Sequence, residues 1–333
     1  MAIIQSLLTA LLLCVPIATA TATAQLPSPL EGPSSFTYAE VGGRPLKLDF
    51  YNADSKIDAP LIIWIHGGAW QSGSRRHVPT EVMKLCSQGI AVASIDYRLT
   101  SQFGQWGKEP VHWPAQRDDA KAAIRWLRAN KETLQLDDSK FIVWGSSAGG
   151  HLATILGLTN DAPGTCGKVG QHLGISSAVR LAIDFFGPTD LFSMNADVTT
   201  PPGSVIDHDA ANSPESLLVG ARQHGHALQD IRDHIDDKKA PWPELVARVR
   251  SASPIHAAAP GHCVPIFIAH GTMDRLIAFE QAKRLQRRVR QLKVSHRWHP
   301  VVGAGHGFPP TIERTAIKWI RAQLTKPLPK DKK

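Results

Sequence analysis

The apolar residues of this chain form short continuous runs that alternate with sets at helical spacing. Runs such as residues 61–65 and 141–144 are typical of strands buried on both faces of a sheet. Between them, residues 115–130 place apolar side chains on one helix face. The pattern predicts an antiparallel strand pair at 36–41 and 44–51, strands at 61–65, 90–95, 141–144, 181–186, 265–269 and 295–302, and helices at 115–130, 148–158, 279–292 and 310–324.

This alternation predicts an α/β fold whose mostly parallel central sheet is covered by helices on both faces. Two stretches break it: residues 100–114 are rich in glycine, proline and aromatic residues, and residues about 190–250 are polar. We interpret both as excursions from the sheet, and the longer one as a small cap or lid insertion. The 333 residues, 43% of them hydrophobic, allow a sizeable core, and we expect residues 25–333 to form a single domain.

The first 24 residues contain no Lys, Arg, Asp or Glu, and residues 3–17 are mostly apolar. Ala22-Thr23-Ala24 supplies the small residues that a cleavage site requires. Residues 1–24 are therefore predicted to be a signal peptide, and the protein to be secreted or periplasmic. An uncleaved membrane anchor is the alternative, but the apolar run is shorter than the roughly 20 residues of a span, so stable membrane insertion is not expected.

Removal of this segment leaves three cysteines, which form at most one internal disulfide. One interpretation is a Cys166–Cys263 bridge with Cys86 buried and free, and the other is three free thiols. The formal net charge is +8, but the basic residues do not accompany a nucleic-acid-binding motif. No H-E-x-x-H or C-x-x-C motif is present either, so we expect no metal, no cofactor and no nucleic-acid partner.

The strongest chemical signal is Gly145-Ser146-Ser147-Ala148-Gly149, which follows an apolar strand and opens an apolar helix. A serine exposed on such a sharp, strained turn needs small flanking residues, and the amide after it can face a substrate oxygen. The alternative is an ordinary glycine-rich connection between strand and helix. The context favours Ser147 as a nucleophile.

A second glycine-rich segment, His66-Gly67-Gly68-Ala69-Trp70, directly follows the 61–65 strand. Its glycines let backbone amides approach a ligand closely. We predict an oxyanion hole in which each donor lowers the barrier by about 3 kcal/mol, while His66 braces the loop. The predicted donors belong to Gly67, Gly68, Ala69 and Ala148.

A serine nucleophile needs a base, and the base needs an orienting carboxylate. His306 lies between glycines after the last predicted strand, and Asp274 follows the 265–269 strand. The order Ser147, Asp274, His306 matches a known triad order. The rival acid is Asp190, which also suits the N-cap of a helix in the insertion. Asp96 is expected to tie a strand end to neighbouring loops.

Together these motifs resemble the α/β-hydrolase superfamily, over roughly residues 36–325. The likeness is greatest to esterases and lipases related to hormone-sensitive lipase, especially their acetylxylan/feruloyl esterase-like branch. Ala69 stands where many hormone-sensitive-lipase relatives have a third glycine, which puts bulky tertiary-alcohol esters in doubt. The motifs are His66-Gly67-Gly68-Ala69-Trp70, Asp96-Tyr97-Arg98-Leu99, the segment from Gly145 to Ala153, Phe186-Gly187-Pro188-Thr189-Asp190, His270-Gly271 with Asp274, and Gly305-His306.

The resemblance implies a carboxylic ester hydrolase that acts through an acyl-enzyme intermediate. Its expected substrates are short acyl or acetyl esters, either small molecules or linked to carbohydrate. Trp70, Phe103, Trp106 and Trp113 are candidates for substrate binding. A serine peptidase of the prolyl-oligopeptidase class is one rival, although such proteins usually carry a large N-terminal propeller. A non-catalytic carbohydrate-binding member of the fold is the other rival. The sequence does not indicate an oligomeric state.

Overall fold

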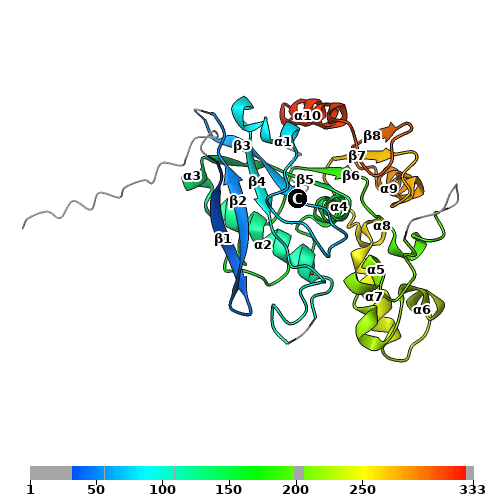
Figure 1. Cartoon of the computed structure of the whole chain (residues 1–333). Coiled ribbons are helices and arrows are strands. Elements are labelled where there is room, and N and C mark those ends of the chain that lie inside the picture. The colour runs from blue at the N-terminus through cyan, green and yellow to red at the C-terminus, as the bar shows by residue number, and fades with distance from the viewer. Residues whose placement is uncertain (1–31, 56, 109, 199–205, 328–333) are drawn as a thin grey trace, which may run out of the picture.

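In a computed structural model of the protein, the described residues are 32–55, 57–108, 110–198 and 206–327. They contain one eight-stranded sheet with the strand order β1-β2-β4-β3-β5-β6-β7-β8 (Figure 1). The strands are β1 (Ser34–Val41), β2 (Arg44–Tyr51), β3 (Ala59–Ile65), β4 (Ala91–Ile95), β5 (Leu136–Ser146), β6 (Leu181–Phe185), β7 (Ile266–Gly271) and β8 (His296–Val301).

The first two strands pair antiparallel, and β2 meets β4 antiparallel as well. All later pairs, from β4–β3 to β7–β8, are parallel. Parallel strands bring their carboxyl ends to one edge of the sheet, so the loops after β3, β5, β6 and β7 meet there. The predicted class, a mostly parallel sheet opened by an antiparallel pair, is confirmed.

Helices cover both faces of the sheet. On one face, α1 (Thr80–Met83) and α10 (Pro310–Leu324) contact each other and share a buried apolar cluster with the sheet (Figure 1). The larger apolar cluster lies on the opposite face and includes residues of α2, α4 and α9. These helices are α2 (Ala115–Ala129), α4 (Ala148–Thr159) and α9 (Phe279–Gln291), with the single turn α3 (Lys131–Leu134) after α2.

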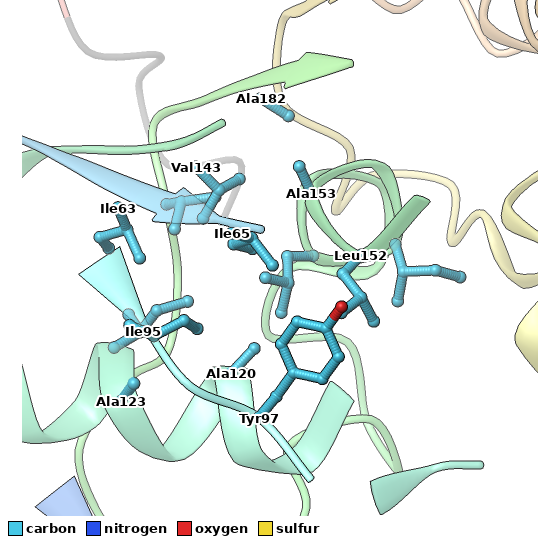
Figure 2. Packing of buried hydrophobic residues seen from close by; sticks show 14 of the residues in the cluster. Ile63, Ile65, Ile95, Tyr97, Ala120, Ala123, Val143, Leu152, Ala153 and Ala182 are labelled. Atoms are coloured by element: carbon cyan, nitrogen blue, oxygen red, sulfur yellow. The ribbon is translucent and has the colours of Figure 1, made fainter. Parts of the chain in front are cut away.

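The larger cluster packs branched strand residues against small helix residues. Figure 2 shows Ile63, Ile65 and Val143 of the central strands beside Leu152 of α4 and Ala120 of α2. Each of these side chains is completely buried. Because alanine lets a helix backbone approach the sheet closely, α2 and α4 are held tightly beneath the carboxyl ends of β3 and β5.

Between β6 and β7 the chain leaves the sheet and forms several short helices, which lie together at one side of the molecule (Figure 1). This stretch is anchored to Trp113, whose backbone N–H donates to the Leu218 carbonyl at 2.7 Å and whose indole N–H donates to Ser251 Oγ at 3.0 Å. The described part of this stretch thus packs against Trp113 of the earlier excursion. The helices are η2 (Leu191–Ser193), α5 (Pro214–Leu218), η3 (Ala221–His224), α6 (Leu228–Asp233), α7 (Trp242–Ala252) and α8 (Pro254–Ala257).

The interpretation of Cys166 and Cys263 as a disulfide is wrong, because all three described cysteines are free thiols. Cys166 lies beside α2, where its carbonyl accepts a hydrogen bond from Arg125 at 2.6 Å. The Cys263 thiol instead donates to the Leu158 carbonyl at the end of α4, at 3.3 Å. Cys86, in the short helix η1 (Cys86–Gln88), is buried as expected.

The predicted signal peptide at residues 1–24 lies outside the described residues. Among the helices that are described, none combines the length and the apolar content needed to cross a bilayer.

Candidate active site

Ser147 stands at the turn between β5 and α4 in a strained backbone conformation, with φ 55° and ψ −124°. Its N–H donates to the Phe185 carbonyl of the neighbouring strand at 2.8 Å, which fixes the turn against β6. A side chain at Gly149 would collide with the Ile65 carbonyl, and one at Gly145 would collide with the Gly149 backbone. The glycines predicted around Ser147 are therefore required by close packing, and the serine side chain is left partly exposed.

The glycine-rich segment after β3 lies directly against Ser147. A Cβ added to Gly67 would come within 3.3 Å of the Ser147 Cβ and within 2.8 Å of the Ser146 carbonyl oxygen. Gly68 has φ +109° and Ala69 has φ 54°, so the chain turns sharply here. Ala148 begins α4 and is buried, which sets its amide at the helix N-terminus beside the same segment.

His66 braces this segment, and Asp96 ties the end of β4 to the neighbouring loop, as the sequence predicted. His66 Nδ1 lies 2.7 Å from the Gly67 carbonyl oxygen, and the Tyr97 hydroxyl donates to the His66 carbonyl at 3.0 Å. Burial lowers the pKa of His66, so its ring is neutral and Nδ1 donates to Gly67. Asp96 accepts from the Arg75 N–H at 2.8 Å and pairs with the Arg75 guanidinium at 2.6 Å.

His306 and Asp274 meet at the carboxyl end of β7. His306 Nδ1 lies 2.7 Å from Asp274 Oδ2. The other carboxylate oxygen, Oδ1, accepts from the backbone N–H groups of Leu276 and Ile277 at 2.9 and 3.0 Å. Burial raises the pKa of Asp274, but hydrogen bonds from His270 and His306 outweigh it and hold that pKa well below its usual range. Asp274 is therefore a fixed carboxylate that orients the His306 ring.

Ser147 and His306 come to the same edge of the sheet through Phe185, the last residue of β6, and Phe186, which follows it. The Phe185 carbonyl holds Ser147, and the ring of the next residue, Phe186, lies 4.5 Å from the His306 ring. His306 Nε2 is buried and has no hydrogen-bond partner among the described residues, so it is not bonded to Ser147 in this structure. Catalytic hydrogen bonds are often long before substrate binds. This arrangement leaves Nε2 as the one ring atom of His306 that can accept a proton.

Asp190, the rival acid, lies in another network. Its carboxylate is 3.3 Å from His256 Nε2 and 3.6 Å from the Arg284 guanidinium, and it accepts from the Ser193 hydroxyl at 2.6 Å. Asp190 occupies the N-cap position of η2 but makes no capping bond to the backbone there. The structure thus brings Asp274, and not Asp190, to His306.

Two of the aromatic residues expected to bind substrate are sealed inside the protein. Trp70 and Trp113 are each 1% exposed, and the Trp70 indole N–H donates to buried His151 at 3.2 Å. That expectation needs correction for both, because packing against α4 encloses their rings. Trp106 is partly buried, with its indole N–H bonded to Gln102. Phe103 is 68% exposed and borders a cavity of about 410 Å³.

His270 lies within one of the motifs above, but its sequence context alone did not indicate a role for it. His270 is fully buried, and its Nε2 lies 2.8 Å from the Ile277 carbonyl and 3.3 Å from Asp274 Oδ2. Its position within the buried strand β7, four residues before Asp274, is a signal that could have identified it. Within the described ranges, no group of three or more His, Cys, Asp or Glu side chains is arranged to hold a metal ion.

Comparison with known proteins places the chain among esterases. The sequence model of the BD-FAE family matches residues 48–289. Esterase LipC of Mycobacterium tuberculosis is 30% identical over 253 residues, which are 75% of this chain and 53% of LipC. This chain therefore spans about half the length of that curated relative.

Solved structures of esterases superimpose on most of the chain. A truncated form of a carbohydrate esterase from gut microbiota has 26% identity and a TM-score of 0.70, and the match covers 91% of this chain and 100% of that one. Esterase 2 of Thermogutta terrifontis with bound propionate has 25% identity and a TM-score of 0.60, with 87% and 92% covered. These likenesses confirm the α/β-hydrolase fold.

Proposed function

Because the chain belongs to the BD-FAE family and has the α/β-hydrolase fold, we propose that it is a serine esterase that cleaves carboxylic esters through Ser147, His306 and Asp274. The observation that carries the proposal is His306: Asp274 holds its Nδ1 at 2.7 Å, and its buried Nε2 has no partner among the described residues. A ring fixed in this way, at the edge where Ser147 is displayed on a strained turn, suits a general base.

In the first step, the Ser147 hydroxyl attacks the ester carbonyl while His306 Nε2 takes its proton. The negative charge that develops on the carbonyl oxygen is stabilised by the amide of Ala148 and by amides of the Gly67–Ala69 segment. His306 then gives the proton to the leaving alcohol, and the acyl group stays on Ser147 as an ester. Asp274 keeps the ring oriented and stabilises its charged form.

In the second step, water replaces the alcohol. His306 Nε2 accepts a proton from water as its oxygen attacks the acyl carbon, and the same amides stabilise the oxyanion. Collapse of this intermediate breaks the bond to Ser147, which recovers its proton from His306, and the carboxylic acid leaves. No cofactor is needed to balance either step.

Hydrolysis of 4-nitrophenyl acetate by the wild type and by Ser147→Ala tests the proposal. We expect the variant to lose at least 10³-fold in kcat, since the nucleophile is removed and only background catalysis remains. Labelling with a fluorophosphonate probe should be lost in parallel. Equal rates for the two proteins would overturn the proposal, and labelling of Ser147 without ester hydrolysis would favour a peptidase.

The proposal extends to the class of substrate. We propose short acyl or acetyl esters, including esters on carbohydrate, as the substrate class. The names of two structural neighbours, a carbohydrate esterase and an esterase with bound propionate, support the same class. A series of 4-nitrophenyl esters together with acetylated xylan and methyl ferulate tests this point. A maximum at long acyl chains would contradict it.

We also propose that the protein acts outside the cytoplasm, because residues 1–24 have the composition of a signal peptide. Expression of the full chain in a bacterial host, followed by cell fractionation and N-terminal sequencing, tests this proposal. The expected result is a secreted or periplasmic protein that begins at Gln25. A cytoplasmic protein that retains Met1 would contradict it.

A further inference from the structure

We propose that a cavity beside the oxyanion segment binds an anionic group of the ester substrate, and that Arg76 is the residue that recognises it. The inference rests on the proposed esterase function and adds a substrate class to it: esters with a carboxylate in the acyl or the alcohol part.

The cavity has a volume of about 580 Å³ and lies beside the oxyanion segment. Part of its wall is formed by Gly67, Gly68 and Ser146, so it borders both the oxyanion segment and the residue before the nucleophile. Polar side chains of Ser72, Arg76 and His77 line the rest together with apolar residues. A substrate whose carbonyl lies at Ser147 can therefore extend one of its ends into this cavity.

The charges around the cavity favour an anion. None of its lining residues is Asp or Glu. Arg75 and Arg76 are adjacent in the sequence but differ in their ion pairs. The Arg75 guanidinium pairs with Asp49 at 2.8 Å and with Asp96 at 2.6 Å. Arg76 is exposed and makes no ion pair with a carboxylate among the described residues. Its guanidinium can thus present two parallel N–H donors to a substrate carboxylate.

The segment that carries Arg76 is anchored to the sheet. The Trp64 indole N–H, at the end of β3, donates to the His77 carbonyl at 2.8 Å. Gly73 has φ +97° and lies against the His66 ring so closely that a Cβ there would collide with it. Because both sides of Arg76 are fixed in this way, the cavity wall is formed before substrate binds, which lowers the entropy cost of binding.

The test compares charged and neutral esters of matched shape. For the acyl part, the pair is mono-4-nitrophenyl adipate and its methyl ester. For the alcohol part, the pair is 4-acetoxybenzoate and its methyl ester. We expect Arg76→Ala to lower the ratio of kcat/KM for the charged over the neutral ester by about five- to tenfold in one of the two pairs, mainly through KM. The pair that responds identifies which part of the substrate carries the carboxylate.

Two control variants sharpen the result. Arg76→Lys should keep part of the preference, since it retains the charge but not the bidentate geometry. Arg290→Ala, which removes an exposed arginine of α9 away from the cavity, should leave the ratio unchanged. Added salt should reduce the preference of the wild type.

The inference is overturned if Arg76→Ala changes neither ratio while the wild type hydrolyses the neutral esters in a Ser147-dependent way. If the wild type hydrolyses none of the four esters, the result would instead count against the esterase function itself.

Discussion

The carboxylate of Asp184 occupies the space that a side chain on Gly150 would need. A Cβ added to Gly150 would come within 2.6 Å of Asp184 Oδ1, which also accepts from the Gly187 N–H at 3.0 Å. Asp184 Oδ2 is buried and has no hydrogen-bond partner among the described residues. Burial raises the pKa of Asp184 to about 7, because a single hydrogen bond does not compensate for the lost hydration of its charged form. A buried acidic group with a raised pKa thus packs against the first turn of α4.

This pKa makes the free energy of unfolding depend on pH. Asp184 ionises near pH 4 in the unfolded chain but only near pH 7 in the folded one. The folded state therefore holds one more proton between these values, and its stability falls as pH rises from about 4 to about 7. Asp184→Asn removes this dependence, so its stability relative to the wild type should rise over that window by up to about 4 kcal/mol.

Urea unfolding at pH 4.5 and pH 8 measures this effect. Asp233→Asn, which changes an exposed aspartate of α6, is the matched control and should show no such trend. If the difference in stability between Asp184→Asn and the wild type is the same at both pH values, Asp184 is already ionised in the folded protein.

Gly67→Ala should damage catalysis more than stability. The added methyl would lie within 2.8 Å of the Ser146 carbonyl oxygen, so the oxyanion segment must shift away from Ser147. Loss of one aligned donor costs about 10²-fold in kcat. Gly174→Ala is the control, because nothing lies within 4 Å of a Cβ at that exposed position. Kinetics with 4-nitrophenyl acetate and thermal melts of both variants separate a displaced oxyanion segment from general unfolding.

The fold was largely predictable because its central strands are buried on both faces. The continuous apolar runs at 61–65 and 141–144 identified β3 and β5, and the helical spacing at 115–130 identified α2 almost to the residue. The beginning of β5 was less clear, because Asp137-Asp138-Ser139-Lys140 extends the strand with polar residues. The hydrophobic pattern identifies only the buried part of a strand, so the polar first residues of β5 carry no such signal.

The site residues were predictable where the reaction requires a particular residue type. They were not predictable where tertiary packing determines whether a side chain is buried or exposed. Small residues around Ser147 and the chain order of Asp274 and His306 indicated the groups that the structure brings to one edge. The same reasoning placed Trp70 and Trp113 at a substrate surface, although both are buried. An indole is equally suited to a core and to a binding site, and only tertiary contacts decide between them.

Trp113→Ala should loosen the contact between the 100–114 excursion and the insertion before β7. The indole is 1% exposed and its N–H donates to Ser251 Oγ at 3.0 Å. Removal of a buried tryptophan costs about 3–5 kcal/mol. Trp106→Ala, at a partly exposed ring, should cost much less. Chemical unfolding of both variants checks this, and similar losses would show that Trp113 is not an anchor.

The identity of the acid can be decided by comparing two aspartates that follow neighbouring strands. Asp274 contacts His306 directly, whereas Asp190 pairs with His256 and Arg284. Asp274→Asn should lower kcat by roughly 10³- to 10⁴-fold, because the amide no longer fixes the productive tautomer of His306. The kcat of Asp190→Asn should stay within about threefold of the wild-type value, because this change weakens only an ion-pair network that does not include His306. Circular dichroism checks that both variants fold. If Asp190→Asn loses more activity than Asp274→Asn, the acid is Asp190, and Asp190 must contact His306 in a different arrangement from the one described.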